Sequence, residues 1–188
     1  MSLPQNTALL VIDLQRAIDH PDWGQRNNPQ AEGNIAALLA SWRAAARPLL
    51  HVRHDSCQPQ SHYRPGQPGH DFKPEAAPLP GETVVCKQTN SAFIGTGLEA
   101  RLRAAGITTL VIAGVITNNS VEATARMAGN LGFDTFVIHD ATFTFGHSDF
   151  DGVSRTAAEV HAMSLANLSG EYATIASKAE VLAAFEHA

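Results

Sequence analysis

The segment Thr108–Gly132 reads TTLVIAGVITNNSVEATARMAGNLG, and it joins a predicted strand to a predicted helix through a tight turn. The run Leu110–Ala113 is apolar and partly β-branched, and Gly114 ends it. This pattern is typical of a strand that is covered on both faces, as in a parallel sheet. A turn that leads from such a strand directly into a helix places its side chains where ligands bind.

The residues after this turn predict where the helix begins. Asn119 and Glu122 have the N-cap to N3 spacing of a capping box, so we expect the helix to begin at Ser120 and to end near Gly129–Gly132. In the first helical turn, backbone N–H groups and the helix dipole stabilise an alkoxide, a thiolate or an oxyanion. A serine there is also common as ordinary helix-start polarity, so this segment alone does not establish a catalytic site.

The whole chain alternates between predicted strands and helices. Four more strand-like segments are Thr7–Asp13, Pro48–Arg53, Thr83–Lys87 and Asp134–His139, and Ala173–Ser177 is a weaker sixth. Helical patterns lie at Pro29–Ala46, Gly97–Ala105, Asn119–Leu131, Val153–Leu168 and Lys178–His187. We therefore predict one α/β domain over residues 1–188, with a mostly parallel six-stranded sheet between two layers of helices.

Composition narrows the range of functions. A chain of 188 residues with 44% hydrophobic residues fits a single domain with an ample core. A formal net charge of −5 without a Lys/Arg cluster argues against nucleic-acid or anionic-membrane binding and favours a small-molecule substrate. Two cysteines, no basic n-region and no apolar run of about 20 residues predict a cytoplasmic protein with reduced thiols.

One polar stretch does not fit the alternation of strands and helices. His54–Gly81 holds six of the ten prolines and is too long for an ordinary connection. We expect a structured loop beside the active site.

Three polar residues follow predicted strands and are expected to meet at one edge of the sheet. Asp13 ends the first strand, Lys87 ends the Thr83–Lys87 strand, and Ser120 follows the central strand. A carboxylate and an ammonium group close together can manage the proton of a third group at a helix start. An ion pair between Asp13 and Lys87 that only orients loops is the alternative.

Three ordered motifs carry a resemblance to a known family over nearly the whole chain. They are ALLVIDLQ from residue 8, KQTNSAFIGTGLEARLRAAGI from residue 87 and GVITNNSVEATARMAGNLGF from residue 114. The chain resembles the isochorismatase-like, or cysteine hydrolase, family. The resemblance implies a six-stranded Rossmann-like sheet, an Asp–Lys–Cys triad, and hydrolysis of a C–N bond in small amides or ureido compounds. We expect no cofactor.

The resemblance also assigns roles to residues. It implies that Asp13 is the general base and that Lys87 supports it and stabilises charge. The family's turn usually contains a non-proline cis peptide, here between Val115 and Ile116. This arrangement would make the N–H groups of Ile116 and Ser120 an oxyanion hole.

The sequence departs from the family at the nucleophile, because Ser120 stands where the family has cysteine. A hydroxyl is far less acidic than a thiol, whose free pKa is about 8.5. Three explanations are open: an experimental replacement of the cysteine, a natural serine variant, or a small-molecule-binding scaffold that has lost catalysis. The isochorismatase branch offers a fourth, vinyl-ether hydrolysis with Asp13 as general acid and no nucleophile.

Neither cysteine is expected to replace the missing nucleophile. Cys86 precedes Lys87 on one strand, so alternation points it to the opposite face, where it would be a small buried residue. Cys57 is interpreted as a loop residue.

Residues that flank the predicted crevice are candidates for substrate contact. They are Gln15, Phe93, Asn118 and Asn119, with core packing as the alternative for Phe93. Arg53 and His54 could bind a carboxylate if they face inward.

The resemblance also bears on metal binding and on the oligomeric state. The nicotinamidase branch of the family carries a metal on an Asp-x-His motif, and this region holds His51, His54, Asp55, His62 and His70. The order His54–Asp55 does not match that motif, so we predict no metal. The family usually forms dimers or tetramers, so we expect a homodimer or homotetramer in which the His54–Gly81 loop helps close the pocket.

Overall fold

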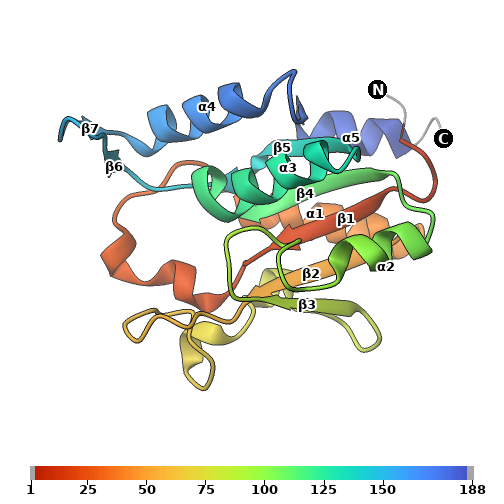
Figure 1. Cartoon of the computed structure of the whole chain (residues 1–188), viewed down its shortest axis with the longest axis horizontal. Helices are drawn as coiled ribbons and strands as arrows, with labels where there is room; N and C mark the ends of the chain where they lie inside the picture. The colour runs from red at the N-terminus through yellow and green to blue at the C-terminus, as the bar shows by residue number, and fades with distance from the viewer. Residues whose placement is uncertain (1–2, 186–188) are drawn as a thin grey trace.

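The computed structural model describes residues 3–185, and its centre is a six-stranded sheet (Figure 1). The strands are β1 (Ala8–Ile12), β2 (Leu49–His54), β3 (Thr83–Lys87), β4 (Thr109–Val115), β5 (Asp134–Phe143) and β8 (Thr174–Ala176). Their spatial order is β3-β2-β1-β4-β5-β8, and each neighbouring pair is parallel. The predicted α/β fold is confirmed, and each of the six predicted strands forms close to its expected position.

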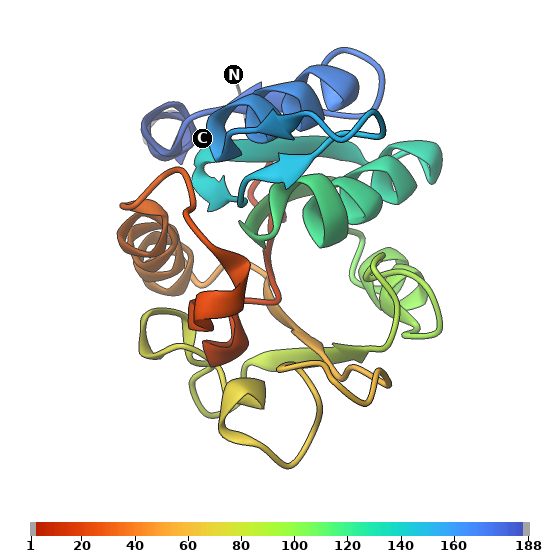
Figure 2. The ribbon, with the colours of Figure 1, turned by 90° about the vertical axis from the view of Figure 1, so that its left-hand side faces the viewer.

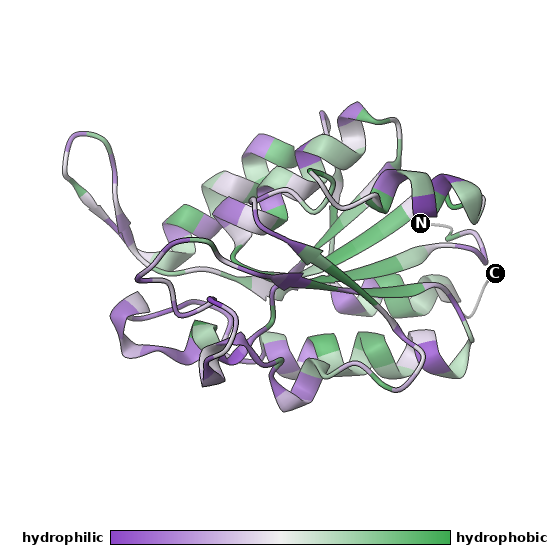
Figure 3. Ribbon diagram, turned by 60° about the horizontal axis from the view of Figure 1, so that its bottom comes forward, coloured by the Kyte–Doolittle hydropathy of each residue, from purple (hydrophilic) through white to green (hydrophobic). Residues whose placement is uncertain are grey.

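Helices cover both faces of this sheet. α1 (Ala31–Ala44) and α5 (Lys178–Phe185) pack on one face, while α2 (Leu98–Ala104), α3 (Glu122–Asn130) and α4 (Ala157–Leu168) pack on the other. Residues of a strand alternate between the two cores: Leu9 and Val11 contact the first core, whereas Leu10 and Ile12 contact the second. Apolar strands lie between more polar helix surfaces (Figure 3). This double cover explains why the central strands are apolar at nearly every position.

The helix after β4 begins differently from the prediction. A wide turn, Thr117–Val121, comes first, and α3 begins at Glu122. The predicted capping box of Asn119 and Glu122 is wrong, because the Ile116 carbonyl accepts the first N–H groups and the Glu122 carboxylate pairs with Arg126. Ser120 nevertheless lies in the first turn after the strand.

A small hairpin between β5 and α4 was not predicted. Its strands are β6 (His147–Ser148) and β7 (Ser154–Arg155), and they extend away from the three layers (Figure 3). The predicted helix start at Val153 is therefore too early, since pairing in the hairpin uses residues 154–155 and a Thr156 capping box starts α4. The predicted last helix extends to His187, which lies outside the described residues.

The long loop is ordered, as expected. It contains the 3-10 helices η3 (Pro68–His70) and η4 (Pro74–Ala76). Two further 3-10 helices, η1 (Arg16–Asp19) and η2 (Pro21–Trp23), follow β1. Gln15 bridges to Phe72 in the loop, so these two segments form one rim beside the sheet. Within residues 3–185, no helix has the length and apolar character that crossing a bilayer requires.

Candidate active site

The candidate site lies at the edge where the parallel strands end, which faces the viewer in Figure 2. The strand order reverses direction between β1 and β4, and ligands of open α/β sheets bind at such a switch point. Asp13 follows β1, Lys87 ends β3, and Ser120 lies in the turn after β4. The predicted convergence of these three residues at one edge is confirmed.

The Lys87 ammonium group connects the other two side chains. Its Nζ donates to Asp13 Oδ2 at 2.6 Å, to Ser120 Oγ at 3.2 Å and to the carbonyl oxygen of Thr89 at 3.0 Å. The three ammonium protons thus have three oxygen acceptors. Lys87 is almost fully buried, and the surface-exposed fraction of Asp13 is 4%. Water therefore screens this charge pair very little.

The backbone around Asp13 is held in an unusual conformation. Asp13 has a φ of +50°, a left-handed value that few residues other than glycine adopt. Its N–H donates to the Val52 carbonyl oxygen, and its own carbonyl accepts the N–H of Gln15. Such conformations persist where the surroundings fix them, and they concentrate at functional sites.

Gly114 brings β4 close to β1 at the same edge. It has a φ of +117°, and a Cβ there would lie 2.2 Å from the carbonyl oxygen of Ile12. Glycine is required at this position because any side chain would push apart the strands that lead to Asp13 and Ser120.

The Asp13 carboxyl group has one oxygen in use and one without a partner. Among the described residues, no group hydrogen-bonds to its buried Oδ1. Burial raises the pKa of Asp13 to about 6, although the Lys87 charge and hydrogen bond and the Ser120 hydroxyl oppose that rise. The carboxyl group can therefore exchange a proton near neutral pH, and Oδ1 is the atom positioned to do so.

His54 and Tyr63 also border the trio; the sequence suggested His54 only as a carboxylate binder, and it gave no indication of Tyr63. His54 Nδ1 lies 3.4 Å from Lys87 Nζ, and burial together with the Lys87 charge lowers the pKa of His54 to about 4. Its imidazole is therefore neutral at pH 7. The Tyr63 hydroxyl donates to the backbone carbonyl of Asp13 at 3.4 Å, and its ring meets His54 edge-on.

The strand order explains this position of His54. β2 lies between β1 and β3, and His54 is the register partner of Lys87. A residue at the carboxyl end of β2 therefore lies between the strands that supply Asp13 and Lys87. Arg53, considered with it as a carboxylate binder, instead contacts Asp55 and Cys86 on the other face of the strand.

Two of the predicted substrate contacts have other roles in the structure. Gln15 has no exposed surface, and its amide bonds the backbone of His54 and the His70 carbonyl, so it joins the long loop to β1 and cannot reach a ligand. The Phe93 ring packs 5.9 Å from that of Phe133, which directly precedes β5 at the opposite edge of the sheet. Phe93 is half-buried and packs against the core, as the alternative interpretation had it.

The other predicted site residues lie at the turn after β4. The Val115–Ile116 peptide bond is cis, as expected. Asn118 and Asn119 are exposed, and Asn118 Oδ1 accepts the Thr144 hydroxyl. Asn118 also borders a hollow of about 850 Å³ along α4 and the hairpin, which does not include the Asp13–Lys87–Ser120 trio.

The cysteines lie away from the trio. Cys86 points to the face opposite Lys87, as alternation predicted, but it is exposed rather than buried because β3 is an edge strand. Cys57 is exposed on the long loop.

The histidines that cluster in sequence do not form one site. His51 is buried against Glu82, His54 borders Lys87, and His70 pairs with Asp55 at 2.7 Å. His62 lies instead beside His20 and Asp22.

Residues 7–180 match the isochorismatase domain. The chain belongs to the isochorismatase family, whose members are hydrolases. A solved structure of an isochorismatase-family protein from Chromobacterium violaceum has a TM-score of 0.98 and 59% identity, and the match covers 100% of this chain and 98% of that one. The uncharacterised family member YrdC of Bacillus subtilis is 42% identical over 173 residues, 92% of each chain. Streptothricin hydrolase of Streptomyces noursei is 37% identical over 141 residues, 73% of this chain and 50% of that protein.

Proposed function

We propose that this isochorismatase-family chain hydrolyses a C–N bond in a small amide or ureido compound. Asp13 acts as general base, Lys87 as hydrogen-bond donor and Ser120 as nucleophile. The observation that carries the proposal is the shared ammonium group: Lys87 bonds both Asp13 Oδ2 and Ser120 Oγ, and it leaves Asp13 Oδ1 without a partner among the described residues. Similarity to a streptothricin hydrolase supports an amide-type substrate.

The first half of the reaction transfers the acyl group to the enzyme. The Ser120 oxygen attacks the carbonyl carbon while Asp13 takes the hydroxyl proton. The N–H groups of Ile116 and Ser120 stabilise the oxyanion that forms, as positioned backbone donors do in acyl transfer. The C–N bond then breaks, and the leaving amine takes the proton from Asp13.

The second half releases the acid. Water attacks the Ser120 ester while Asp13 accepts one of its protons. The C–O bond to Ser120 breaks, the proton returns to the serine oxygen, and the carboxylic acid product leaves. Throughout, the Lys87 ammonium group stabilises the negative charge that develops on the serine oxygen.

Vinyl-ether hydrolysis with Asp13 as general acid is the second candidate. The observation in its favour is the pKa of Asp13, which burial raises to about 6. A fraction of the molecules therefore carries a protonated Asp13 near neutral pH. This reaction does not need residue 120 as a nucleophile. A binding protein that has lost catalysis is the third candidate, and the replacement of the family's cysteine by Ser120 favours it.

The deciding experiment compares the native chain with Ser120→Cys on a panel of small amides, ureido compounds and vinyl ethers. The amide proposal predicts turnover by the native chain and an increase of about 10²-fold or more for Ser120→Cys, because a thiolate forms far more readily than an alkoxide. Activity gained only by the cysteine form identifies a lapsed thiol enzyme. Equal vinyl-ether turnover by both forms supports the general-acid mechanism. Ligand binding without turnover by either form supports the binding protein.

We further propose that the chain forms a homodimer or homotetramer. Phe150 at the tip of the hairpin is 97% exposed, and Met163 borders the adjacent hollow along α4. An apolar tip and an apolar hollow on one chain fit a self-complementary interface. Light scattering is expected to give a mass above 20 kDa, and a single species of 20.0 kDa at micromolar concentration would contradict it.

A further inference from the structure

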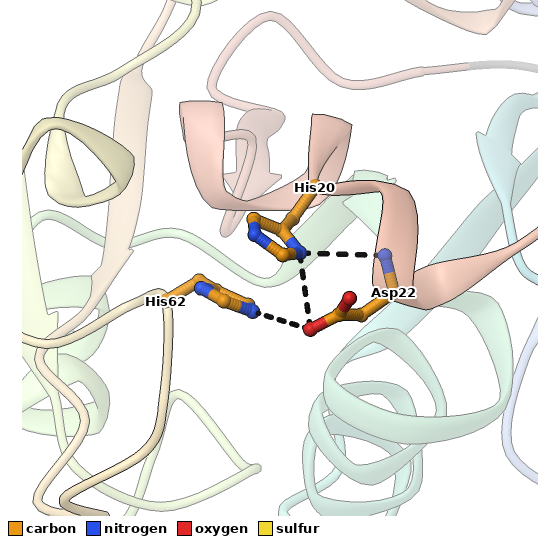
Figure 4. Close-up of side chains that lie close together, drawn as sticks. All are labelled: His20, Asp22 and His62. Carbon is orange, nitrogen blue, oxygen red and sulfur yellow. Dashed lines mark hydrogen bonds and ion pairs between the residues drawn. The ribbon is translucent and has the colours of Figure 1, made fainter.

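Three side chains outside the candidate active site converge on one another in Figure 4. His20 precedes η2, Asp22 lies within it, and His62 comes from the long loop. The carboxylate oxygen Asp22 Oδ2 lies 3.2 Å from His20 Nδ1 and 3.2 Å from His62 Nε2. One oxygen and two ring nitrogens therefore lie within 4.8 Å of one another.

The contact between His20 Nδ1 and Asp22 Oδ2 needs a proton or a metal ion between the two atoms. The Asp22 N–H donates to His20 Nδ1 at 3.3 Å, a geometry that fits a ring nitrogen with a lone pair. The same nitrogen faces the carboxylate oxygen Asp22 Oδ2, which is also an acceptor. Two acceptors at 3.2 Å repel each other unless a proton or a metal ion lies between them.

We infer that His20, Asp22 and His62 form a binding site for a divalent transition-metal ion such as Zn²⁺. Two imidazole nitrogens and one carboxylate oxygen are a ligand set that such ions favour, with water in the fourth position. Metal–ligand distances of about 2.0–2.1 Å in a tetrahedron place neighbouring ligand atoms roughly 3.3 Å apart, which matches both 3.2 Å contacts to Asp22. All three side chains are partly exposed, so an ion can enter from solvent.

Binding requires the two imidazole rings to rotate. They are stacked, with centroids 3.4 Å apart and planes inclined by 18°, so their lone pairs run nearly parallel. A tilt about the Cβ–Cγ bonds aims both nitrogens at one ion, and this torsion of histidine is soft.

The inferred ion would join two segments of the rim. His20 and Asp22 follow β1, whereas His62 belongs to the loop that follows β2 and also carries Tyr63. The Tyr63 hydroxyl bonds the Asp13 carbonyl, so an ion at His62 would hold this loop against the segment that follows Asp13. The role is therefore a clamp on the rim, separate from the chemistry at Asp13, Lys87 and Ser120.

The test is a metal titration of the full, tag-free chain after treatment with a chelator. Zn²⁺ binding is measured by calorimetry, Co²⁺ binding by visible absorption, and the melting temperature with and without Zn²⁺. We expect one ion per chain and a rise in melting temperature of about 5 °C at saturation. The titration is repeated in a chain with Cys57→Ser and Cys86→Ser, because both thiols are exposed and could bind zinc.

Variants locate the ion. His20→Ala, Asp22→Asn and His62→Ala are each expected to weaken binding by at least about tenfold and to remove the shift in melting temperature. His147→Ala is the matched control, because His147 is exposed on the hairpin away from the cluster. The inference is overturned if the native chain shows no saturable binding, if His62→Ala binds as the native chain does, or if the control or the cysteine-free chain loses binding.

Discussion

Two buried carboxyl groups in this molecule each face a lysine, yet their environments differ. Glu32 accepts two hydrogen bonds from Arg26 at 2.6 Å and one from Lys73 at 3.0 Å, so both of its oxygens are occupied. Burial raises the pKa of Glu32, but these bonds outweigh that effect and bring it to about 2. Asp13 accepts a hydrogen bond from Lys87 on one oxygen, and burial raises its pKa to about 6.

The difference separates a carboxylate that stabilises the fold from one that can do chemistry. Glu32 is fully paired, so its charge is permanent at neutral pH and its contribution is structural. Asp13 has a buried oxygen without a partner in the described part of the chain and a pKa of about 6. Both features disfavour a purely structural ion pair and suit a group that exchanges protons. The following predictions test this separation.

Asp13→Asn is expected to have the largest effect. Asparagine keeps the shape of the side chain but cannot exchange a proton, so turnover should fall by roughly 10²-fold or more while ligand affinity changes little. The measurement is steady-state kinetics in the most active form of the protein, with ligand binding by calorimetry. Circular dichroism serves as the check on folding, because the change leaves Lys87 without its counter-charge.

Survival of turnover in Asp13→Asn would show that Asp13 is structural, as Glu32 is. The hydrolytic mechanism proposed above would then fail.

The pH dependence of kcat/KM is expected to show which direction the proton moves. A general base must be ionised, so the rate should rise about tenfold per pH unit below an apparent pKa of about 6 and level off above it. A general acid must be protonated, so vinyl-ether hydrolysis should instead decline above pH 6. A rate that is flat between pH 5 and 7 would show that Asp13 has neither role. As the control, Asp13→Asn should remove the change in rate with pH around the pKa of about 6.

Glu32→Gln is expected to change stability rather than catalysis. Loss of a charged acceptor shared by Arg26 and Lys73 should lower the free energy of unfolding by about 2 kcal/mol at pH 7, measured by urea denaturation. The folded pKa of about 2 lies below the usual 4.5, so this contribution is present above pH 4.5 and is lost as the pH falls toward 2. The free energies of unfolding of the native chain and the variant should therefore converge in acid. Their kcat values at pH 7 should be equal.

The contribution of Asp13 to the free energy of unfolding is expected to change with pH in the opposite direction to that of Glu32. Its folded pKa of about 6 lies above the usual 3.8, so its contribution is present below pH 3.8 and is lost as the pH rises through 6.

If Glu32→Gln reduced turnover as strongly as Asp13→Asn, the separation between the two carboxylates would not hold.

Cys86→Ser is expected to have the smallest effect. Its thiol lies on the exposed face of β3, opposite the buried Lys87 side chain, so turnover should stay within about twofold of the parent. Steady-state kinetics in parallel with Asp13→Asn measures this difference, and a loss of tenfold or more would show that the other face of β3 takes part in the site.

Much of the fold followed from local patterns. Apolar runs such as Leu110–Ala113 predicted strands covered on both faces, and strand ends then placed Asp13, Lys87 and Ser120 together. The capping box at Asn119 failed, because the wide turn from Thr117 depends on how β4 leaves the sheet rather than on the spacing of two residues. The β6–β7 hairpin was missed because strands of two residues carry almost no periodic signal.

Individual side chains were harder to predict than the edge on which they lie. Gln15 follows Asp13 closely enough to suggest a ligand contact, but the long loop uses its amide for backbone hydrogen bonds. The convergence of His20, Asp22 and His62 depends on how that loop folds back on η2, and no local pattern encodes this. His54 was considered only as a carboxylate binder, because its place beside Lys87 depends on β2 lying between β1 and β3, and local patterns do not reveal strand order.

The three residues of the candidate site do not rest on equally protected strands. β1 and β4 are interior strands, but β3, which carries Lys87, is an edge strand that pairs only with β2 within residues 3–185. Backbone amides at such an edge exchange with solvent through local openings that leave the interior of a sheet intact. Lys87 can therefore leave the site by fraying of one strand, and inactivation in mild denaturant would precede global unfolding.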